Sequence, residues 1–268
     1  MKIIYSLFIM AILLCSACEY KLKPNDNKQE LRIEVQRYDR LESRYLTTGD
    51  FSALQQMNTN YPMETRTLIE NVLQLGEVSD SEINSKFLKF YQDTLLQIII
   101  ADIETQYANM DDINCNLNKA FERLQNILPK IELPTVYAQI GALDQSVVIG
   151  DKSIGISLDK YLGKDYPPYK KFYSVQQRST MTRDFIVPDC LNFYLVSLFP
   201  LKNYTNRSQM EKDLHMGKVM WVVNKIMDTN FFNTKYVGMV DEYMKKNKKV
   251  SIKDMLLSDN YQLIQEAG

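Results

Sequence analysis

The change of hydrophobic period along the chain constrains its fold more than any other feature. Apolar residues recur at helical spacing through most of residues 34–128 and again from residue 188 onward. Between these regions, the short β-branched runs 134–140, 146–149 and 154–158 are separated by turns that contain Gly, Asp and Ser. We therefore predict an α+β fold that is predominantly helical and has one small antiparallel sheet, built as a meander.

Caps and apolar stripes mark the individual helices. The clearest helix is residues 111–128, where apolar residues recur every three or four positions, two acids stand at the start and Pro129 follows the end. Ser208 and Glu211 have the spacing of a capping box at the start of another helix. The predicted helices are 34–47, 62–75, 79–91, 94–107, 111–128, 188–199, 208–227, 235–246 and 252–257.

The first eighteen residues have the layout of an export signal. The apolar run 3–14 follows a lysine and is too short to cross a bilayer, since a spanning helix needs about 20 residues. Residues 16–18 (Ser-Ala-Cys) form a small-residue cleavage site ending in a cysteine, although Cys15 stands where an aliphatic residue is usual. We predict that residues 1–17 are removed and that Cys18 is acylated, as in a bacterial lipoprotein. Soluble secretion and a retained N-terminal anchor are the alternatives.

The rest of the chain divides into a polar tether, residues 18–32, and a single helix-rich domain, residues 33–268. After processing, the chain has 31 Lys and Arg and 33 Asp and Glu. No basic surface is therefore expected, and no nucleic acid partner is predicted. We expect two kinds of partner: the membrane, through the lipid on Cys18, and unidentified envelope proteins. We expect the anchor to lie in the outer membrane, and the lack of an acidic cluster after Cys18 favours a position facing the periplasm.

The chain offers little catalytic chemistry. Its single histidine, His215, is followed by Met-Gly-Lys-Val, so the Glu and the second His of a zinc-peptidase helix are both absent. It also lacks a Gly-x-Ser-x-Gly elbow, a glycine-rich phosphate loop and a metal-spaced cysteine cluster. We predict no catalytic residue, no metal and no cofactor, a packed or surface position for His215, and buried, unpaired thiols at Cys115 and Cys190.

One segment leaves a second function open. The middle region holds Asp159, Asp165 and Asp184, and several aromatic residues cluster near two of these acids. A glycosidase needs two carboxylates across an aromatic-lined cleft. The alternative function is therefore a carbohydrate-binding or hydrolytic envelope lipoprotein that uses segment 159–173. The competing interpretation is structural: Asp159 orders a turn after a strand, Tyr161 packs, and Gly163 supplies a positive φ. A purely structural lipoprotein without a specific partner is a third hypothesis.

Several short motifs occur in an order that is typical of one protein family. They are Val-Gln-Arg-Tyr-Asp at 35–39, the strand that begins at Pro134, Leu-Asp-Lys-Tyr-Leu-Gly at 158–163, and a helix that contains Gly217 and Lys218. Over residues 33–227 the chain resembles the gliding-motility lipoprotein B (GldB) family of Bacteroidetes.

The resemblance implies a zincin-like fold, related to zinc-dependent peptidases but without their metal-binding motif. It also implies an accessory envelope role in gliding or in its associated protein secretion. The residues that it marks as structural or family-motif positions are Asp159, Tyr161, Gly163, Gly217 and Lys218.

Overall fold

The computed structural model describes residues 32–267. The predicted signal peptide, the acylated Cys18 and nearly all of the predicted tether lie outside these residues, so they remain predictions. The contact pattern divides the chain between Leu31 and Arg32. No helix within residues 32–267 is both long enough and apolar enough to cross a membrane.

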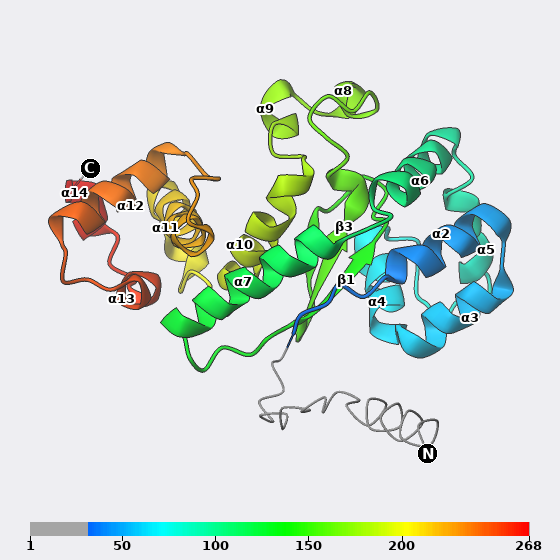
Figure 1. The fold of residues 1–268 in the computed structure, drawn as a ribbon, viewed down its shortest axis with the longest axis horizontal. Coiled ribbons are helices and arrows are strands. Elements are labelled where there is room, and N and C mark those ends of the chain that lie inside the picture. Colours follow the sequence, from blue (N-terminus) through cyan, green and yellow to red (C-terminus); the bar gives the residue numbers. More distant parts are fainter. Residues whose placement is uncertain (1–31, 268) are drawn as a thin grey trace, which may run out of the picture. The chain divides into compact units, whose positions relative to one another are not determined.

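Helices form most of the described chain, and one small sheet lies among them (Figure 1). The predominantly helical α+β class is therefore confirmed. The helices ahead of the sheet are α2 (Tyr38–Thr48), α3 (Phe51–Asn60), α4 (Pro62–Arg66), the π-helix η1 (Thr67–Val72), α5 (Ile83–Phe90), α6 (Thr94–Gln106) and α7 (Asp111–Ile127).

The second half of the chain is again helical, apart from short connecting turns. Its elements are η2 (Leu158–Lys160), α8 (Tyr169–Phe172), α9 (Val175–Arg178), η3 (Arg183–Phe185), α10 (Ile186–Leu198), η4 (Tyr204–Asn206), α11 (Gln209–Met227), α12 (Lys235–Lys246), α13 (Ile252–Leu257) and α14 (Gln262–Ala267). The capping box at the start of α11 forms as predicted, with both Ser208 and Glu211 bonded to each other's backbone.

The sheet is mixed, so the prediction of an antiparallel meander is wrong for one strand pair. Its strands β1 (Thr135–Gln139), β2 (Val147–Ile149) and β3 (Ser153–Ser157) have the order β1-β3-β2. β2 and β3 pair antiparallel, whereas β1 and β3 pair parallel. Tyr137 lies opposite Gly155, and a Cβ on Gly155 would come within 2.6 Å of the tyrosine ring. Because Gly155 has no side chain, the Tyr137 ring fits against it. The alternation of apolar residues in the sequence does not predict this strand pairing.

An extended stretch ahead of α2 covers the other edge of β1. The N–H of Gln36 donates to the Val136 carbonyl at 2.8 Å, and the Ala138 N–H donates to the Gln36 carbonyl at 2.9 Å. Upstream, the side chain of Asn118 on α7 accepts from the Ile33 N–H and donates to the Ile33 carbonyl. These bonds satisfy an edge that would otherwise expose unpaired backbone groups.

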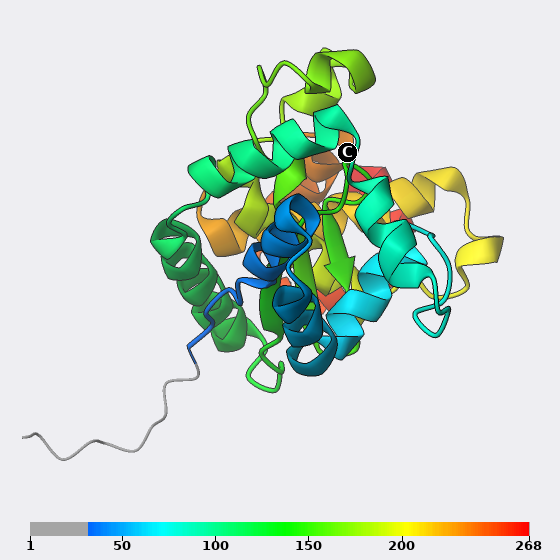
Figure 2. The ribbon, with the colours of Figure 1, turned by 90° about the vertical axis from the view of Figure 1, so that its right-hand side faces the viewer.

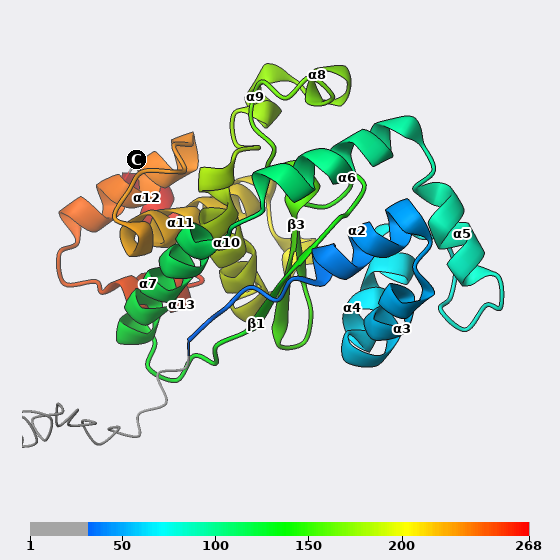
Figure 3. The same ribbon diagram turned by 45° about the vertical axis from the view of Figure 1, so that its right-hand side comes forward.

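Helices flank the strands on two sides. Figures 1 and 3 show α2 to α6 on one side of the sheet and α10 to α13 on the other. In Figure 2, α2 lies in front of the strands, and it packs against β1. The buried apolar residues of both sides form one continuous core, with members such as Tyr38, Ile156, Leu191 and Val222.

The two cysteines of the described region are free, but only Cys190 on α10 is buried. Cys115 is exposed, so the prediction that it is buried is wrong. It lies two residues beyond Ile113, whose side chain faces the core from α7. Two residues turn a helix by about 200°, which directs Cys115 to the opposite face.

Candidate functional site

The turn that leaves β1 holds an unusual backbone conformation. Ala142 and Leu143 have φ angles of 52° and 65°, in the left-handed region. A residue other than glycine costs about 1–3 kcal/mol there and keeps this conformation only when its surroundings impose it. The contacts that impose it come from the Leu-Asp-Lys-Tyr-Leu-Gly motif.

Asp159 binds the N–H groups of this turn. Its side chain is fully buried, one oxygen accepts from the Gly141 N–H at 2.7 Å, and the other accepts from the Leu143 N–H. Burial raises the pKa of Asp159, whereas the two backbone bonds lower it. Because both oxygens are bonded to the turn, the carboxylate serves the chain's own backbone.

The side chains of Lys160 and Tyr173 bind a carbonyl group of the same turn. The Leu143 carbonyl accepts from the Tyr173 hydroxyl at 2.5 Å and from the Lys160 ammonium at 3.2 Å. The Lys160 ammonium also lies 4.4 Å from the centre of the Tyr173 ring, a cation–π contact. Both N–H groups and a carbonyl group of the turn are therefore hydrogen-bonded to side chains.

Tyr161 and Gly163 join the motif to three other parts of the chain. The buried Tyr161 hydroxyl donates to Asp189 at 2.8 Å, at the start of α10, and the Tyr161 carbonyl accepts from the Tyr107 hydroxyl at 2.6 Å. Gly163 has a φ of 117°, which a side chain would strain, and its N–H donates to the Met181 carbonyl at 3.0 Å.

The site contains a second buried acid, Glu42 of α2, that the sequence analysis missed. Its carboxylate accepts from the Ile140 N–H at 2.8 Å, and burial raises its pKa well above the usual value. The Ile140 carbonyl in turn accepts from the Tyr91 hydroxyl. One signal was available: Glu42 stands between Tyr38 and Leu46 on the buried stripe of its helix.

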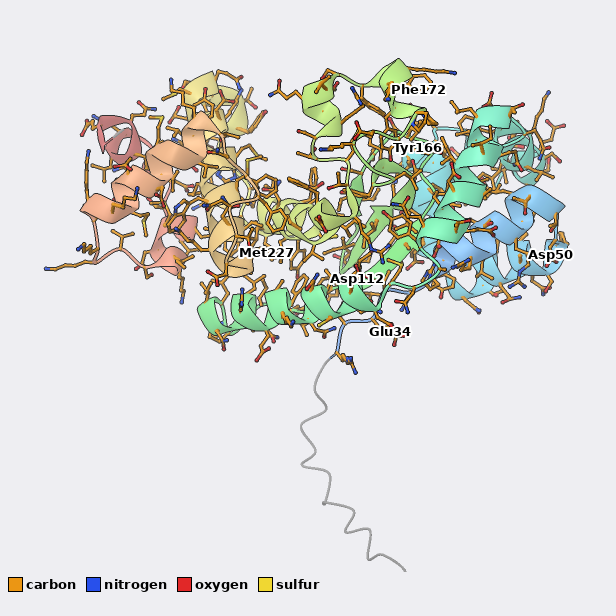
Figure 4. The ribbon with its side chains drawn as sticks, turned by 45° about the horizontal axis from the view of Figure 1, so that its top comes forward. Glu34, Asp50, Asp112, Tyr166, Phe172 and Met227 are labelled. Atoms are coloured by element: carbon orange, nitrogen blue, oxygen red, sulfur yellow. The ribbon has the colours of Figure 1, made fainter. Side chains whose placement is uncertain are left out.

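The acids proposed for a carbohydrate site differ in their exposure to solvent. Asp159 is fully buried, whereas Asp165 and Asp184 are exposed. Figure 4 shows Tyr166 and Phe172 on the arch that carries α8 and α9, and the Tyr166 hydroxyl donates to Asp102 of α6. Segment 159–173 is thus filled by its own tyrosines, so Asp159 presents no free carboxylate to a sugar.

Gly217 lies where α11 meets α12. A Cβ at this position would lie 2.5 Å from the Tyr236 Cβ and 2.8 Å from the Tyr236 backbone carbon. Only a residue without a side chain allows this approach.

Lys218 attaches the C-terminal segment to α11. Its ammonium is buried and donates to the Ser258 carbonyl at 2.7 Å and to the Tyr261 hydroxyl at 3.2 Å. Burial lowers the pKa of Lys218 to about 8. His215 lies on the same helix with Nδ1 2.8 Å from the Tyr261 hydroxyl, and burial lowers its pKa to about 4. His215 is therefore a packed histidine.

Two further features bear on a ligand or metal site. No group of three or more His, Cys, Asp or Glu within residues 32–267 is placed to hold a metal ion. A cavity of about 610 Å³ lies between the loop 128–134, the turn 150–152 and the end of α10. No pattern in the sequence predicts this cavity.

The geometry defines a helix-rich α+β protein in which the motif residues hold the chain's own backbone. Residues 19–236 match the family model described as "Gliding motility protein GldB". The match spans well over half of the chain, so the chain belongs to this family, and the resemblance seen in its motifs is confirmed. Searches of curated proteins and of solved structures gave no match.

The two helical glycines of the α11–α12 pair give a matched test of close packing. We expect Gly217→Ala to lower the free energy of unfolding by about 1–3 kcal/mol, because the new Cβ meets Tyr236. Gly238→Ala should raise it by about 0.5–1 kcal/mol, since the space around Gly238 is open. Urea unfolding of the full chain measures both. Equal effects of the two substitutions would contradict the assignment of Gly217 to close packing.

Asp189 gives a pH-dependent test of the Tyr161 contact. Burial raises the pKa of Asp189 to about 7, so between about pH 4 and 7 the folded chain holds a proton that the unfolded chain has lost. This contribution to stability is complete below about pH 4 and is lost as the pH rises through 7.

Asp189→Asn keeps an oxygen for the Tyr161 hydroxyl but cannot ionise. Relative to the wild type, the variant should therefore gain about 1–3 kcal/mol in unfolding free energy between pH 4.5 and 7.5. Asp184→Asn, at an exposed acid nearby, is the control and should show no such change. A wild-type-to-variant difference that is the same at every pH would refute the assignment.

Proposed function

We propose that this member of the GldB family is a lipid-anchored envelope protein that works without catalysis. Its folded part binds another protein of the gliding apparatus or of the associated protein secretion, and the lipid on Cys18 holds it at the outer membrane. One observation carries the non-catalytic part of this proposal. Asp159, Lys160, Tyr161 and Gly163 of the family motif are all bonded within the chain itself.

The groups with shifted pKa values support the same function. A general acid or base has to reach a substrate atom, directly or through one water. Glu42, Asp159 and Lys218 are buried, and each is bonded to the protein's own backbone. Burial in a structural network shifts a pKa as effectively as burial in an active site. These shifts therefore do not require a catalytic role.

The anchor is tested by cysteine substitution in the full chain. Cells that make the tagged protein are fed an alkyne fatty acid and then fractionated. We expect label and membrane recovery for the wild type and for Cys15→Ser, a matched control three residues away. Cys18→Ser should lose the label, because its hydroxyl cannot form the thioether. Label that persists on the Cys18→Ser protein would overturn the anchor.

The binding role is tested separately, by chemical crosslinking of the wild-type full chain in its own cells and capture of the tagged protein. We expect one or more envelope proteins in a fixed ratio to the chain, and fewer of them with Cys18→Ser. The captured protein is also assayed for zinc content and peptidase activity. Stoichiometric zinc with turnover would contradict a non-catalytic role, and capture of the chain alone would contradict a binding role.

A further inference from the structure

The cavity near the end of α7 has the size and lining of a ligand site. Its volume of about 610 Å³ lies within the roughly 300–1,000 Å³ that small-molecule pockets occupy. The loop 128–134 forms one wall, the last turn of α10 forms another, and α13 contributes Lys253. The apolar lining includes Leu128, Ile131, Leu133, Tyr194, Leu198 and Phe199.

Some backbone groups of the loop wall cannot bind a ligand, because they are absent or already bonded. Pro129 and Pro134 have no N–H, the Glu132 carbonyl accepts from the Tyr194 hydroxyl at 2.7 Å, and the Ile131 N–H is bonded within the loop. A hydrocarbon chain needs no hydrogen-bond partner, and the apolar side chains of the wall suit it.

Charged side chains at the cavity favour an anionic head group. Lys152 pairs with Glu132 at 3.1 Å and also interacts with Asp151. Lys130 and Lys253 line the same cavity from two different elements. Neither forms an ion pair within residues 32–267, and Lys253 interacts electrostatically with its neighbour Asp254. Two unpaired ammonium groups beside an apolar cavity complement a carboxylate that ends a hydrocarbon chain.

We propose that this cavity binds a long-chain fatty acid. The acyl chain lies against Ile131, Leu133 and Leu198, and the carboxylate lies at Lys130 and Lys253. Burial of the chain removes apolar surface of both ligand and cavity from water, and the two lysines fix its direction. This site is independent of the lipid proposed on Cys18, and either can exist without the other.

The test uses the full chain in cells that produce it, with a palmitate probe that carries a photoreactive diazirine in its chain and an alkyne for detection. After irradiation we expect an adduct that excess palmitate suppresses, mapped by mass spectrometry to peptides covering residues 128–134 or 194–199. Absence of a palmitate-suppressed adduct, or adducts confined to other peptides, would overturn the proposal. Acylation at Cys18 is distinguished because it forms without light.

Two further sets of variants test the chain and the head group. Ser197→Trp fills the cavity from its exposed rim and should lower the adduct yield about tenfold, a change typical of a blocked pocket. Ser85→Trp, at an exposed helical serine outside the cavity, is the matched control and should change nothing. Equal yields from both variants would place the adduct elsewhere.

The double variant Lys130→Glu and Lys253→Glu tests the carboxylate. It should weaken competition by palmitate about tenfold, as expected for two reversed charges, while competition by uncharged hexadecanol is unchanged. Circular dichroism of each purified variant shows whether it is folded. Unchanged competition by palmitate in a folded double variant would refute the lysine contacts, and stronger competition by an apolar peptide than by palmitate would refute the fatty acid.

Discussion

The bond between the Asp159 carboxylate and the turn after β1 is the interaction on which the rest of this structure depends. The turn places Ala142 and Leu143 in the left-handed region, and the buried carboxylate accepts hydrogen bonds from the Gly141 and Leu143 N–H groups. An acid without such bonds would be too costly to bury. The acid and the strained turn therefore stabilise each other, and together they fix where β1 ends and where the chain turns towards β2.

The same motif connects the sheet to both groups of helices. Glu42 of α2 binds the backbone next to the turn, and Tyr161 reaches Asp189 of α10 on the other side of the strands. Farther along, Gly217 and Lys218 bring α12 and the C-terminal segment onto α11. The family motifs thus identify positions that build the fold. The cavity beside α10 is lined by other residues.

The sequence predicted most elements whose determinants are local. Caps, periodicity and Pro129 placed the helix that is observed at Asp111–Ile127, and the helices at 235–246 and 252–257 were predicted at their observed bounds. The strand order was not predictable, because it depends on Tyr137 meeting Gly155 across the sheet. Helix α3 was missed because it buries only Ala53, Leu54 and Met57, and α8, α9 and α14 are too short to show a period.

The candidate site shows the same contrast between local and long-range determinants. Structural roles for Asp159, Tyr161 and Gly163 could be anticipated from a turn after a strand, an aromatic residue and a glycine. The Glu42 contact could not, since its partner Ile140 lies 98 residues away in the sequence. The cavity could not be predicted either, because its walls come from four separate segments that only the tertiary fold brings together.

The most direct measurement is the stability and amide exchange of Asp159→Asn in the full chain, beside Asp165→Asn at an exposed acid of the same segment. The amide of asparagine would direct an N–H group at a backbone N–H of the turn. We expect a loss of about 2–4 kcal/mol in unfolding free energy and faster exchange at Gly141 and Leu143. The control should change neither quantity. Wild-type stability and exchange in Asp159→Asn would contradict this account.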